Sequence, residues 1–276
     1  MALKRCIALA SLSILVAATA PASAGQLLDD SSAGWPPIWS AGATVSISPE
    51  YEGSDEYKVT AIPYVFPSFG LAASRIEVRG ADDVRFKVLR EDRFELGPLA
   101  GYRFDREEGD GPKLAGLGDV DGGLVVGGFM RAALLPSLYA GVSYHRTVTG
   151  DVDGGQLRFG LEYETKPTYS VSVFARAGAT YADDAYMDAY FGVTSAQQGT
   201  SGAGLQAFDA DAGIKDVYAT LGAQIQLAER WKLNLKGQYT RLVGDAADSP
   251  VIETEDQFSG SAGIIYRFGP RKSSAN

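Results

Sequence analysis

The sequence predicts an all-β protein, an antiparallel transmembrane β-barrel of about twelve strands. Three observations predict this fold. Apolar and polar residues alternate along many segments, the connections between these segments alternate between short and long, and the chain begins with an export signal. We therefore expect residues 1–24 to be a cleaved signal peptide and residues 25–276 to form one outer-membrane β-barrel domain.

The composition excludes several other classes of protein. Of the 276 residues, 45% are hydrophobic, which is too many for a disordered polymer. The formal net charge is −9 and the pI is about 4.7, whereas a nucleic-acid-binding protein needs a basic surface. A single Cys and a single His disfavour a zinc site or a cysteine protease, because these sites need several thiols or imidazoles.

The first 24 residues have the three parts of a secretory signal. Lys4 and Arg5 form the basic region, an apolar run covers residues 7–18, and Ala22-Ser23-Ala24 fits the cleavage pattern of small residues. The alternative is an N-terminal membrane anchor. Cleavage would remove Cys6, so the mature chain would be stabilised without disulfides, by an extensive core or a closed sheet.

The alternation of residues is clearest in residues 231–240. Trp231, Leu233 and Leu235 fall on one face, while the side chains between them are polar. After Gly25 no apolar run reaches the roughly 18 residues that a transmembrane helix needs. The expected strands are 36–50, 58–67, 71–79, 84–89, 94–104, 122–135, 138–149, 155–165, 168–182, 212–227, 231–243 and 257–268.

A water-soluble β-sandwich also alternates, but its apolar face points inward. Here aromatic residues lie at the ends of the apolar faces, as in the pairs Tyr169 and Tyr181 or Trp231 and Tyr239. This placement is typical of the interfacial girdles of a barrel whose apolar face contacts lipid. Three prolines fall within expected strands and predict bulges or strand ends, namely Pro63, Pro67 and Pro98.

The expected connections alternate in length. Short links are 68–70, 90–93, 136–137, 166–167 and 228–230, and long links are 51–57, 80–83, 105–121, 150–154, 183–211 and 244–256. Short turns on one rim and long loops on the other are typical of an outer-membrane barrel with both termini in the periplasm. The long links hold 23 of the 34 acidic residues and only two basic ones, Arg106 and Lys113.

The last expected strand ends in the pattern of an assembly signal. Gly263, Tyr266 and Phe268 are spaced as in the C-terminal signals of bacterial outer-membrane barrels, although eight residues follow Phe268. The alternative is an ordinary edge strand.

The mature chain resembles the MipA/OmpV family, the family of the MltA-interacting protein. The resemblance covers about residues 39–268. It is carried by YEGSDEY at 51–57, LGP at 96–98, GYRF at 101–104, YFGVT at 190–194, KDV at 215–217, LVGDAADSP at 242–250, DQFSG at 256–260 and YRF at 266–268. It implies a protein of the Gram-negative outer membrane. It also implies an adaptor that joins a lytic transglycosylase to a bifunctional penicillin-binding protein during peptidoglycan assembly.

The candidate chemistry is sparse. Ser143 and His145, the only imidazole, share a face of one expected strand, but no orienting acid or oxyanion donor is recognisable from spacing. The sequence Asp-Val-Asp-Gly-Gly occurs at 119–123 and again at 151–155, where alternate carboxylates could bind a hard cation. Both copies lack the remaining ligands of an EF-hand and suit a turn. We therefore expect no catalytic residues, no cofactor and no resident metal ion.

The inward-facing charges leave two possibilities open, since they could line a pore or pair across a filled interior. They are Arg75, Arg79, Arg85, Lys87, Glu95, Arg103, Arg131, Arg158, Glu162, Arg176, Lys232 and Lys236. We expect a non-enzymatic scaffold in contact with outer-membrane lipid and lipopolysaccharide. The alternatives are a narrow channel for small solutes or cations and a lipid-modifying enzyme.

Overall fold

The computed structural model describes residues 40–66, 75–150 and 152–268. The expected signal peptide at 1–24, Pro67 and the beginnings of the first and third expected strands lie outside these residues. All statements about the fold below concern the described parts of the chain.

Thirteen strands form one antiparallel sheet in these parts of the chain. They are β1 (Ser40–Pro49), β2 (Tyr57–Phe66), β3 (Ile76–Gly80), β4 (Asp83–Phe86), β5 (Leu89–Glu91), β6 (Phe94–Arg103), β7 (Gly123–Leu135), β8 (Leu138–Thr147), β9 (Gly155–Thr168), β10 (Val171–Ala182), β11 (Gly213–Ala228), β12 (Trp231–Leu242) and β13 (Asp256–Arg267).

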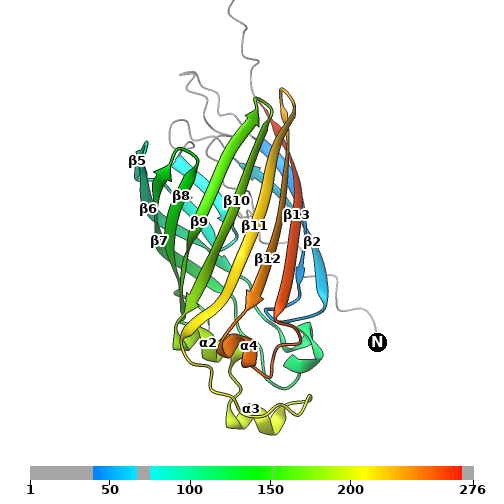
Figure 1. The fold of residues 1–276 in the computed structure, drawn as a ribbon. Helices are drawn as coiled ribbons and strands as arrows, with labels where there is room; N and C mark the ends of the chain where they lie inside the picture. The colour runs from blue at the N-terminus through cyan, green and yellow to red at the C-terminus, as the bar shows by residue number, and fades with distance from the viewer. Residues whose placement is uncertain (1–39, 67–74, 151, 269–276) are drawn as a thin grey trace, which may run out of the picture.

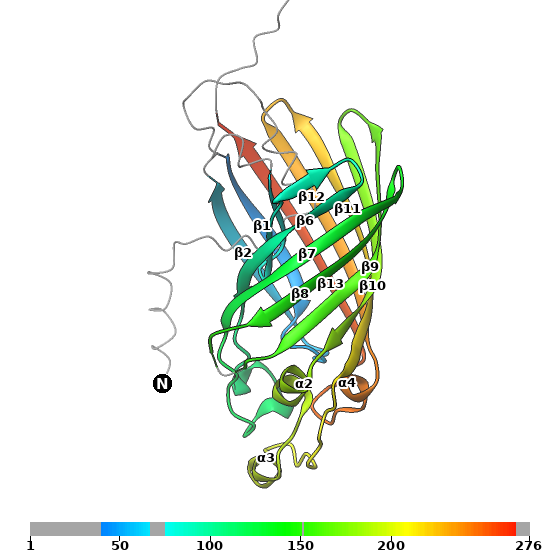
Figure 2. The ribbon, with the colours of Figure 1, turned by 90° about the vertical axis from the view of Figure 1, so that its left-hand side faces the viewer.

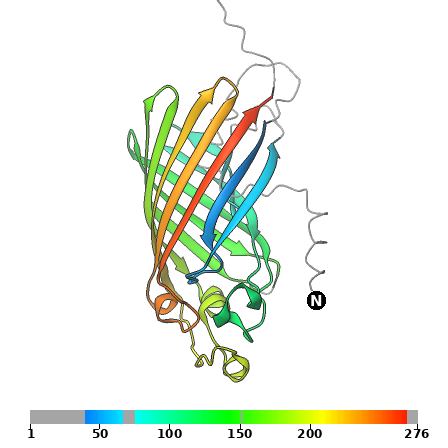
Figure 3. The same ribbon diagram turned by 90° about the vertical axis from the view of Figure 1, so that its right-hand side faces the viewer.

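The sheet curls into a barrel of tilted strands (Figures 1 and 2). Its hydrogen-bonded order is β2-β1-β13-β12-β11-β10-β9-β8-β7-β6-β4-β3, and β5 also pairs with β6. Strand β1 therefore pairs with both β2 and the C-terminal strand β13, and the three run side by side in Figure 3. Because β4 and β5 pair with different parts of β6, thirteen strands occupy twelve positions, which confirms the expected arrangement.

The interruption between β4 and β5 lies opposite Gly97 and Pro98 of β6. Leu99 pairs with Arg85 of β4, and Leu96 pairs with Leu89 of β5. Pro98 has no N–H to donate, so the ladder is weak at this point. Gly97 allows a close approach of the chain, since a Cβ there would lie 1.8 Å from the carbonyl oxygen of Phe86. The sequence signal of Pro98 therefore marks a break in the neighbouring strand.

The expected turn at 166–167 is wrong. Strand β9 continues to Thr168, and the turn consists of Tyr169 and Ser170. The register between β9 and β10 shifts between Val171 and Val173, opposite Lys166 and Pro167. This irregularity accommodates a proline inside the strand, because the missing N–H does not interrupt a regular ladder.

The outer wall of the barrel is apolar, as expected. Leu221 and Val217 of β11 are exposed, whereas Thr220 and Gln224 of the same strand are buried inside. Aromatic pairs flank this surface at both ends. Trp231 and Tyr266 have ring centroids 4.8 Å apart at the short-turn end, and Tyr239 and Phe258 are 5.1 Å apart at the long-loop end. An apolar wall between two aromatic girdles is the surface of a membrane-spanning barrel.

The long connections contain helices that sequence reasoning missed. They are α2 (Asp184–Phe191), α3 (Ser195–Thr200), α4 (Asp245–Asp248) and the 3-10 turns η2 (Glu108–Asp110) and η3 (Pro112–Leu114). Asp183 caps α2 by accepting a hydrogen bond from the backbone N–H of Tyr186 at 3.0 Å. None of the described helices has the length and apolar character required to cross a bilayer.

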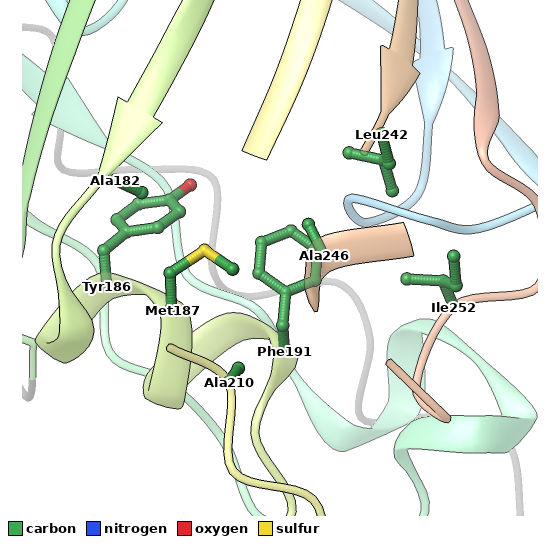
Figure 4. Packing of buried hydrophobic residues seen from close by; sticks show 8 residues of the cluster. All are labelled: Ala182, Tyr186, Met187, Phe191, Ala210, Leu242, Ala246 and Ile252. Carbon is green, nitrogen blue, oxygen red and sulfur yellow. The ribbon is translucent and has the colours of Figure 1, made fainter. Parts of the chain in front are cut away.

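These helices and their loops pack together at one end of the barrel (Figure 1). We call the segments 50–56, 104–122, 183–212 and 243–255 the cap. Met187 and Phe191 of α2 are buried against Ala246 of α4 (Figure 4). The buried apolar residues form two clusters: Ala182, Tyr186, Met187, Phe191, Ala210, Leu242, Ala246 and Ile252 in the first, and Tyr51, Leu114, Leu117, Val193 and Val251 in the second.

Candidate functional site

The lumen contains a network of buried ion pairs, and Glu162 of β9 lies at its centre. Its carboxylate oxygens are 3.0 Å from Arg79 Nη1, 2.9 Å from Arg176 Nη2 and 3.7 Å from Arg131 Nη2. These arginines come from β3, β10 and β7. A carboxylate shared by three guanidinium groups links four strands, so these inward charges pair with one another inside the barrel.

A second part of the network comes from the hairpin of β3 and β4. Glu77 forms ion pairs with Arg79 at 2.5 Å and with Lys87 at 2.9 Å, and Lys87 is also 2.9 Å from Glu95 of β6. Glu77 is 1% exposed. A buried carboxylate is stable only beside cationic partners, and here Arg79 and Lys87 neutralise Glu77. The hairpin therefore fills its side of the lumen with paired charges.

The tip of this hairpin lies inside the lumen. Asp82 accepts hydrogen bonds from the guanidinium group of Arg158 on β9, and the N–H of Tyr102 donates to the carbonyl oxygen of Ala81 at 2.9 Å. The expectation that residues 80–83 form a long loop on the acidic rim is therefore wrong. The connection is a tight turn, which ends below the cap, and its carboxylates pair with interior arginines.

Ser143 and His145 are in contact beside this hairpin tip. His145 Nε2 lies 2.9 Å from Ser143 Oγ, and Nδ1 lies 3.2 Å from the carbonyl oxygen of Asp82. A carboxylate oxygen, Asp83 Oδ2, lies 3.9 Å from Nε2, so it approaches the nitrogen that faces the serine. In a catalytic triad the acid orients the other nitrogen. His145 is fully buried, and it links β8 to the hairpin.

A cavity of about 920 Å³ lies in the lumen beside this network. On one side it meets Arg79, Arg158 and Arg176 of the network. On the other side it meets hydroxyl and amide groups from β1, β2, β11, β12 and β13. Among the described residues these groups are Ser46, Ser48, Thr60, Thr220, Gln238, Thr240, Ser259 and Ser261. The arginines thus lie on one side of the cavity, and the hydroxyl and amide groups lie on the other side together with Lys58, Lys215, Asp216 and Lys236.

The cap is fastened to the barrel through Glu52. Its carboxylate lies 2.8 Å from Lys215 Nζ at the start of β11 and accepts a hydrogen bond from Tyr186 Oη at 3.1 Å. Burial disfavours the charged form of Glu52, but Lys215 and Tyr186 outweigh it and hold the pKa of Glu52 below its usual value of 4.5. Burial and the neighbouring Glu52 raise the pKa of the Tyr186 phenol, which therefore stays protonated as a donor.

The Asp-Val-Asp-Gly-Gly repeats have structural partners. Asp119 accepts a hydrogen bond from the N–H of Glu108 at 2.7 Å, and Asp153 pairs with Arg146 at 2.8 Å. Hydrogen bonds from Arg146 lower the pKa of Asp153. Asp151 lies outside the described residues. In the described ranges no group of three or more His, Cys, Asp and Glu side chains is arranged to hold a metal ion.

The residues of the expected assembly signal lie in β13 and directly after it. Tyr266 and Phe268 stack edge to face at 4.8 Å on the short-turn girdle, and Gly263 pairs with Thr44 of β1. A Cβ at Gly263 would lie 2.5 Å from Thr44 Oγ1. Sequence reasoning missed the three residues that fasten the cap, Glu52, Tyr186 and Lys215. Glu52 and Lys215 do fall within YEGSDEY and KDV, two of the segments that carry the family resemblance.

Solved structures of outer-membrane proteins resemble this chain at low sequence identity. A bacterial polysaccharide outer-membrane secretin gives a TM-score of 0.45 at 10% identity, covering 84% of this chain and 98% of that one. The translocator domain of the autotransporter NalP from Neisseria meningitidis gives 0.40 at 13% identity, covering 89% and 92%. The outer-membrane channel DcaP of Acinetobacter baumannii gives 0.38 at 9% identity, covering 84% and 96%.

The family comparison is decisive. A search of the curated proteins finds no matching sequence. The model of the family described as MltA-interacting protein MipA matches residues 41–268. This range begins one residue after the start of β1 and ends one residue after β13, so it covers the whole described barrel and its cap. The chain, an antiparallel transmembrane β-barrel with a folded cap, therefore belongs to the MipA family.

Proposed function

We propose that this protein is a non-enzymatic scaffold of the Gram-negative outer membrane that serves peptidoglycan assembly. It would hold a lytic transglycosylase and a bifunctional penicillin-binding protein near the inner surface of that membrane. The observation that carries the proposal is membership of the family whose model is described as MltA-interacting protein. The chemistry in the lumen agrees with a scaffold, because Ser143 and His145 are buried under the hairpin tip and have no triad geometry.

The short-turn rim is the surface we propose for the enzymes. Strands β1 and β13 begin and end there, since Ser40 pairs with Arg267. In outer-membrane barrels this rim faces the periplasm, where cell-wall enzymes act, and the longer loops face outward. The outward apolar wall would contact lipid. The acidic cap would neighbour lipopolysaccharide and share divalent cations with its phosphates, since a carboxylate-rich surface attracts counter-ions.

Export is part of the same proposal. We propose that a signal peptidase removes residues 1–24, so that the mature chain begins at Gly25. Intact-mass measurement of the protein from outer-membrane fractions tests this. A retained N-terminus would favour the membrane-anchor alternative.

A binding experiment with purified enzymes tests the scaffold. The refolded protein is immobilised in detergent, and a lytic transglycosylase and a bifunctional penicillin-binding protein from the same organism are passed over it. We expect both enzymes to bind. Reversing the charge of Arg93, Lys166 and Arg230 on the short-turn rim should weaken binding at least tenfold, because rim charges steer association.

The matched control reverses charges on the other rim, at Glu107 and Asp209 of the cap. This control should bind as the unchanged protein does. Absence of binding by either enzyme at low salt contradicts the scaffold. Equal loss in the two variants would mean that binding follows net charge and not the short-turn rim.

A further inference from the structure

Several cationic groups that line the lumen cavity have no hydrogen-bond acceptor among the described residues. The side chain of Lys236 on β12 lines the cavity, and its ammonium group makes no hydrogen bond or ion pair with another described residue. Arg176 Nε and Arg79 Nη2 are buried and also have no acceptor within the described parts of the chain. Buried donors of this kind are costly unless something occupies the space in front of them. Three cationic side chains from three strands therefore line the same cavity.

The carboxylates of the cavity do not neutralise this region. Asp105, Glu107 and Asp110 line the cavity from the cap segment after β6, whereas Lys236 lies in the middle of its strand. Deeper in the lumen, Asp82, Asp83 and Glu162 pair with arginines, and Asp83 also approaches His145. The two remaining carboxylates, Glu52 and Asp216, pair with Lys215. The middle of the cavity is therefore cationic.

Hydroxyl groups follow Lys236 across the neighbouring strands. One row of the sheet places Lys236 of β12 next to Ser261 of β13, Ser46 of β1 and Thr60 of β2. The hydroxyl groups of Ser48, Ser259 and Ser261 make no hydrogen bond to other described residues. In the neighbouring row, Gln238 accepts a hydrogen bond from Thr220 at 3.1 Å. Hydroxyl and amide groups can both donate and accept, which is what several hydroxyl groups of a ligand require.

The size and access of the cavity suit a small molecule. Its volume of about 920 Å³ lies within the range of ligand pockets. It also reaches Lys58, Asp105 and Glu107, which are exposed beside the cap, so the cavity communicates with solvent.

We propose that the lumen binds a small anionic carbohydrate, with its negative group against Lys236 and Arg176 and its hydroxyl groups against the Ser, Thr and Gln wall. The negative group is a carboxylate or a phosphate, since both accept charge-assisted hydrogen bonds from Lys and Arg. The inference is independent of the scaffold function, because the site lies inside the barrel and the proposed enzyme surface lies on its rim.

Titration calorimetry on the refolded barrel in detergent tests the site with four probes. Glucuronate and glucose 6-phosphate carry both features, glucose lacks the charge, and inorganic phosphate lacks the carbon-bound hydroxyl groups. We expect at least one charged sugar to bind at least tenfold more tightly than glucose and inorganic phosphate. The stronger of the two charged sugars identifies the negative group.

Two variants locate the binding. Lys236→Gln should weaken binding of the charged sugar at least tenfold. Gln238→Leu should also weaken binding of the charged sugar, but it should leave the affinity for inorganic phosphate unchanged. The matched control, Lys232→Gln, removes an inward lysine of the same strand that does not line the cavity and should bind normally. Each variant is first checked for the heat-modifiable mobility of a folded barrel. No binding of either charged sugar, equal binding of inorganic phosphate, or normal binding by folded Lys236→Gln and Gln238→Leu overturns the proposal.

Discussion

Lys215 Nζ, at the start of β11, lies 2.8 Å from Glu52 Oε1 in the loop after β1, so one ion pair joins the cap to the wall of the barrel. The same ammonium group is 2.6 Å from Asp216 Oδ2. Because Tyr186 of α2 also donates to Glu52, the carboxylate connects a loop, a helix and a strand. The cap is therefore a folded part of the barrel and not a set of independent loops.

The cap should loosen in acid because of Glu52. Its folded pKa lies below 4.5, so its contribution to stability is present above about pH 4.5 and is lost as pH falls through the folded pKa. Hydrogen exchange of residues 184–191, corrected for intrinsic rates, should show lower protection at pH 3.5 than at pH 7. Glu52→Gln should lower protection at pH 7 and reduce the pH dependence. Glu56→Gln, an exposed change in the same loop, is the control and should behave as the unchanged protein. Equal protection at the two pH values would contradict the role of Glu52.

Asp188 of α2 should destabilise the cap at neutral pH. Partial burial, with Asp184, Asp209 and Asp211 nearby, raises its pKa above 3.8. Its protonated form is therefore favoured in the folded cap, and stability falls as pH rises through this range. Asp188→Asn should raise cap protection at pH 7 by less than about 1 kcal/mol, because the side chain is exposed. The gain should disappear below pH 3.8, and a gain that persists there would point to a cause other than charge.

Glu162 and Glu164 should contribute very different amounts to the stability of the barrel, although both lie on β9. Glu162 is 6% exposed and contacts three arginines, whereas the Glu164 side chain is 34% exposed and has a 2.9 Å contact with Arg131. Glu162→Gln leaves buried cations without their counter-ion, so we expect a loss of roughly 3 kcal/mol in the free energy of unfolding. Glu164→Gln should cost less than about 1 kcal/mol. Urea titration of the protein in lipid vesicles measures both, and equal losses would contradict a central role for Glu162.

The intact barrel should not conduct steadily. The cap covers one end through two apolar clusters, and the hairpin network fills one side of the lumen. Planar-bilayer recordings of the unchanged protein should therefore be silent. A variant in which residues 184–211 are replaced by a short Gly-Ser turn should show more frequent current steps. Steady ion-selective steps from the unchanged protein would favour the channel alternative.

Assembly in the outer membrane should depend on the aromatic end of β13. Phe268→Ala and Tyr266→Ala should each reduce the heat-modifiable fraction in outer-membrane preparations. Gly263→Val should do the same, because the added side chain would collide with Thr44. Phe258→Ala removes an exposed aromatic residue at the opposite end of the same strand and serves as the control. Normal assembly of all three test variants would contradict an assembly signal at the end of β13.

Much of the barrel follows from local pattern, because a residue facing lipid and its neighbour facing the lumen differ in polarity. The alternation in β11 and β12 therefore located both strands to within a residue or two. The turn after β9 was misplaced because Pro167 signals a break whether it ends a strand or lies in a bulge.

The cap and the hairpin tip depend on long-range contacts that spacing does not encode. Residues 183–211 contain short helices whose apolar residues face partners some sixty residues away, such as Ala246 against α2. In the sequence, nothing distinguishes Asp82 from the other acidic residues of the expected loops. Its role depends on Arg158, which lies 76 residues further along the chain. The alternation predicts that the side chains of Arg158 and Glu162 point into the lumen. Whether such charges line a pore or pair with one another depends on which side chains they meet, and the sequence does not show this.

The hairpin of β3 and β4 has one more consequence. Its turn stops inside the lumen while its strands remain hydrogen-bonded to each other and, through β4, to β6. A separately folded plug domain could leave a barrel while the wall stays intact. Here the hairpin that obstructs the lumen is itself part of the barrel wall. Opening the passage would therefore require breaking the backbone hydrogen bonds between β4 and β6.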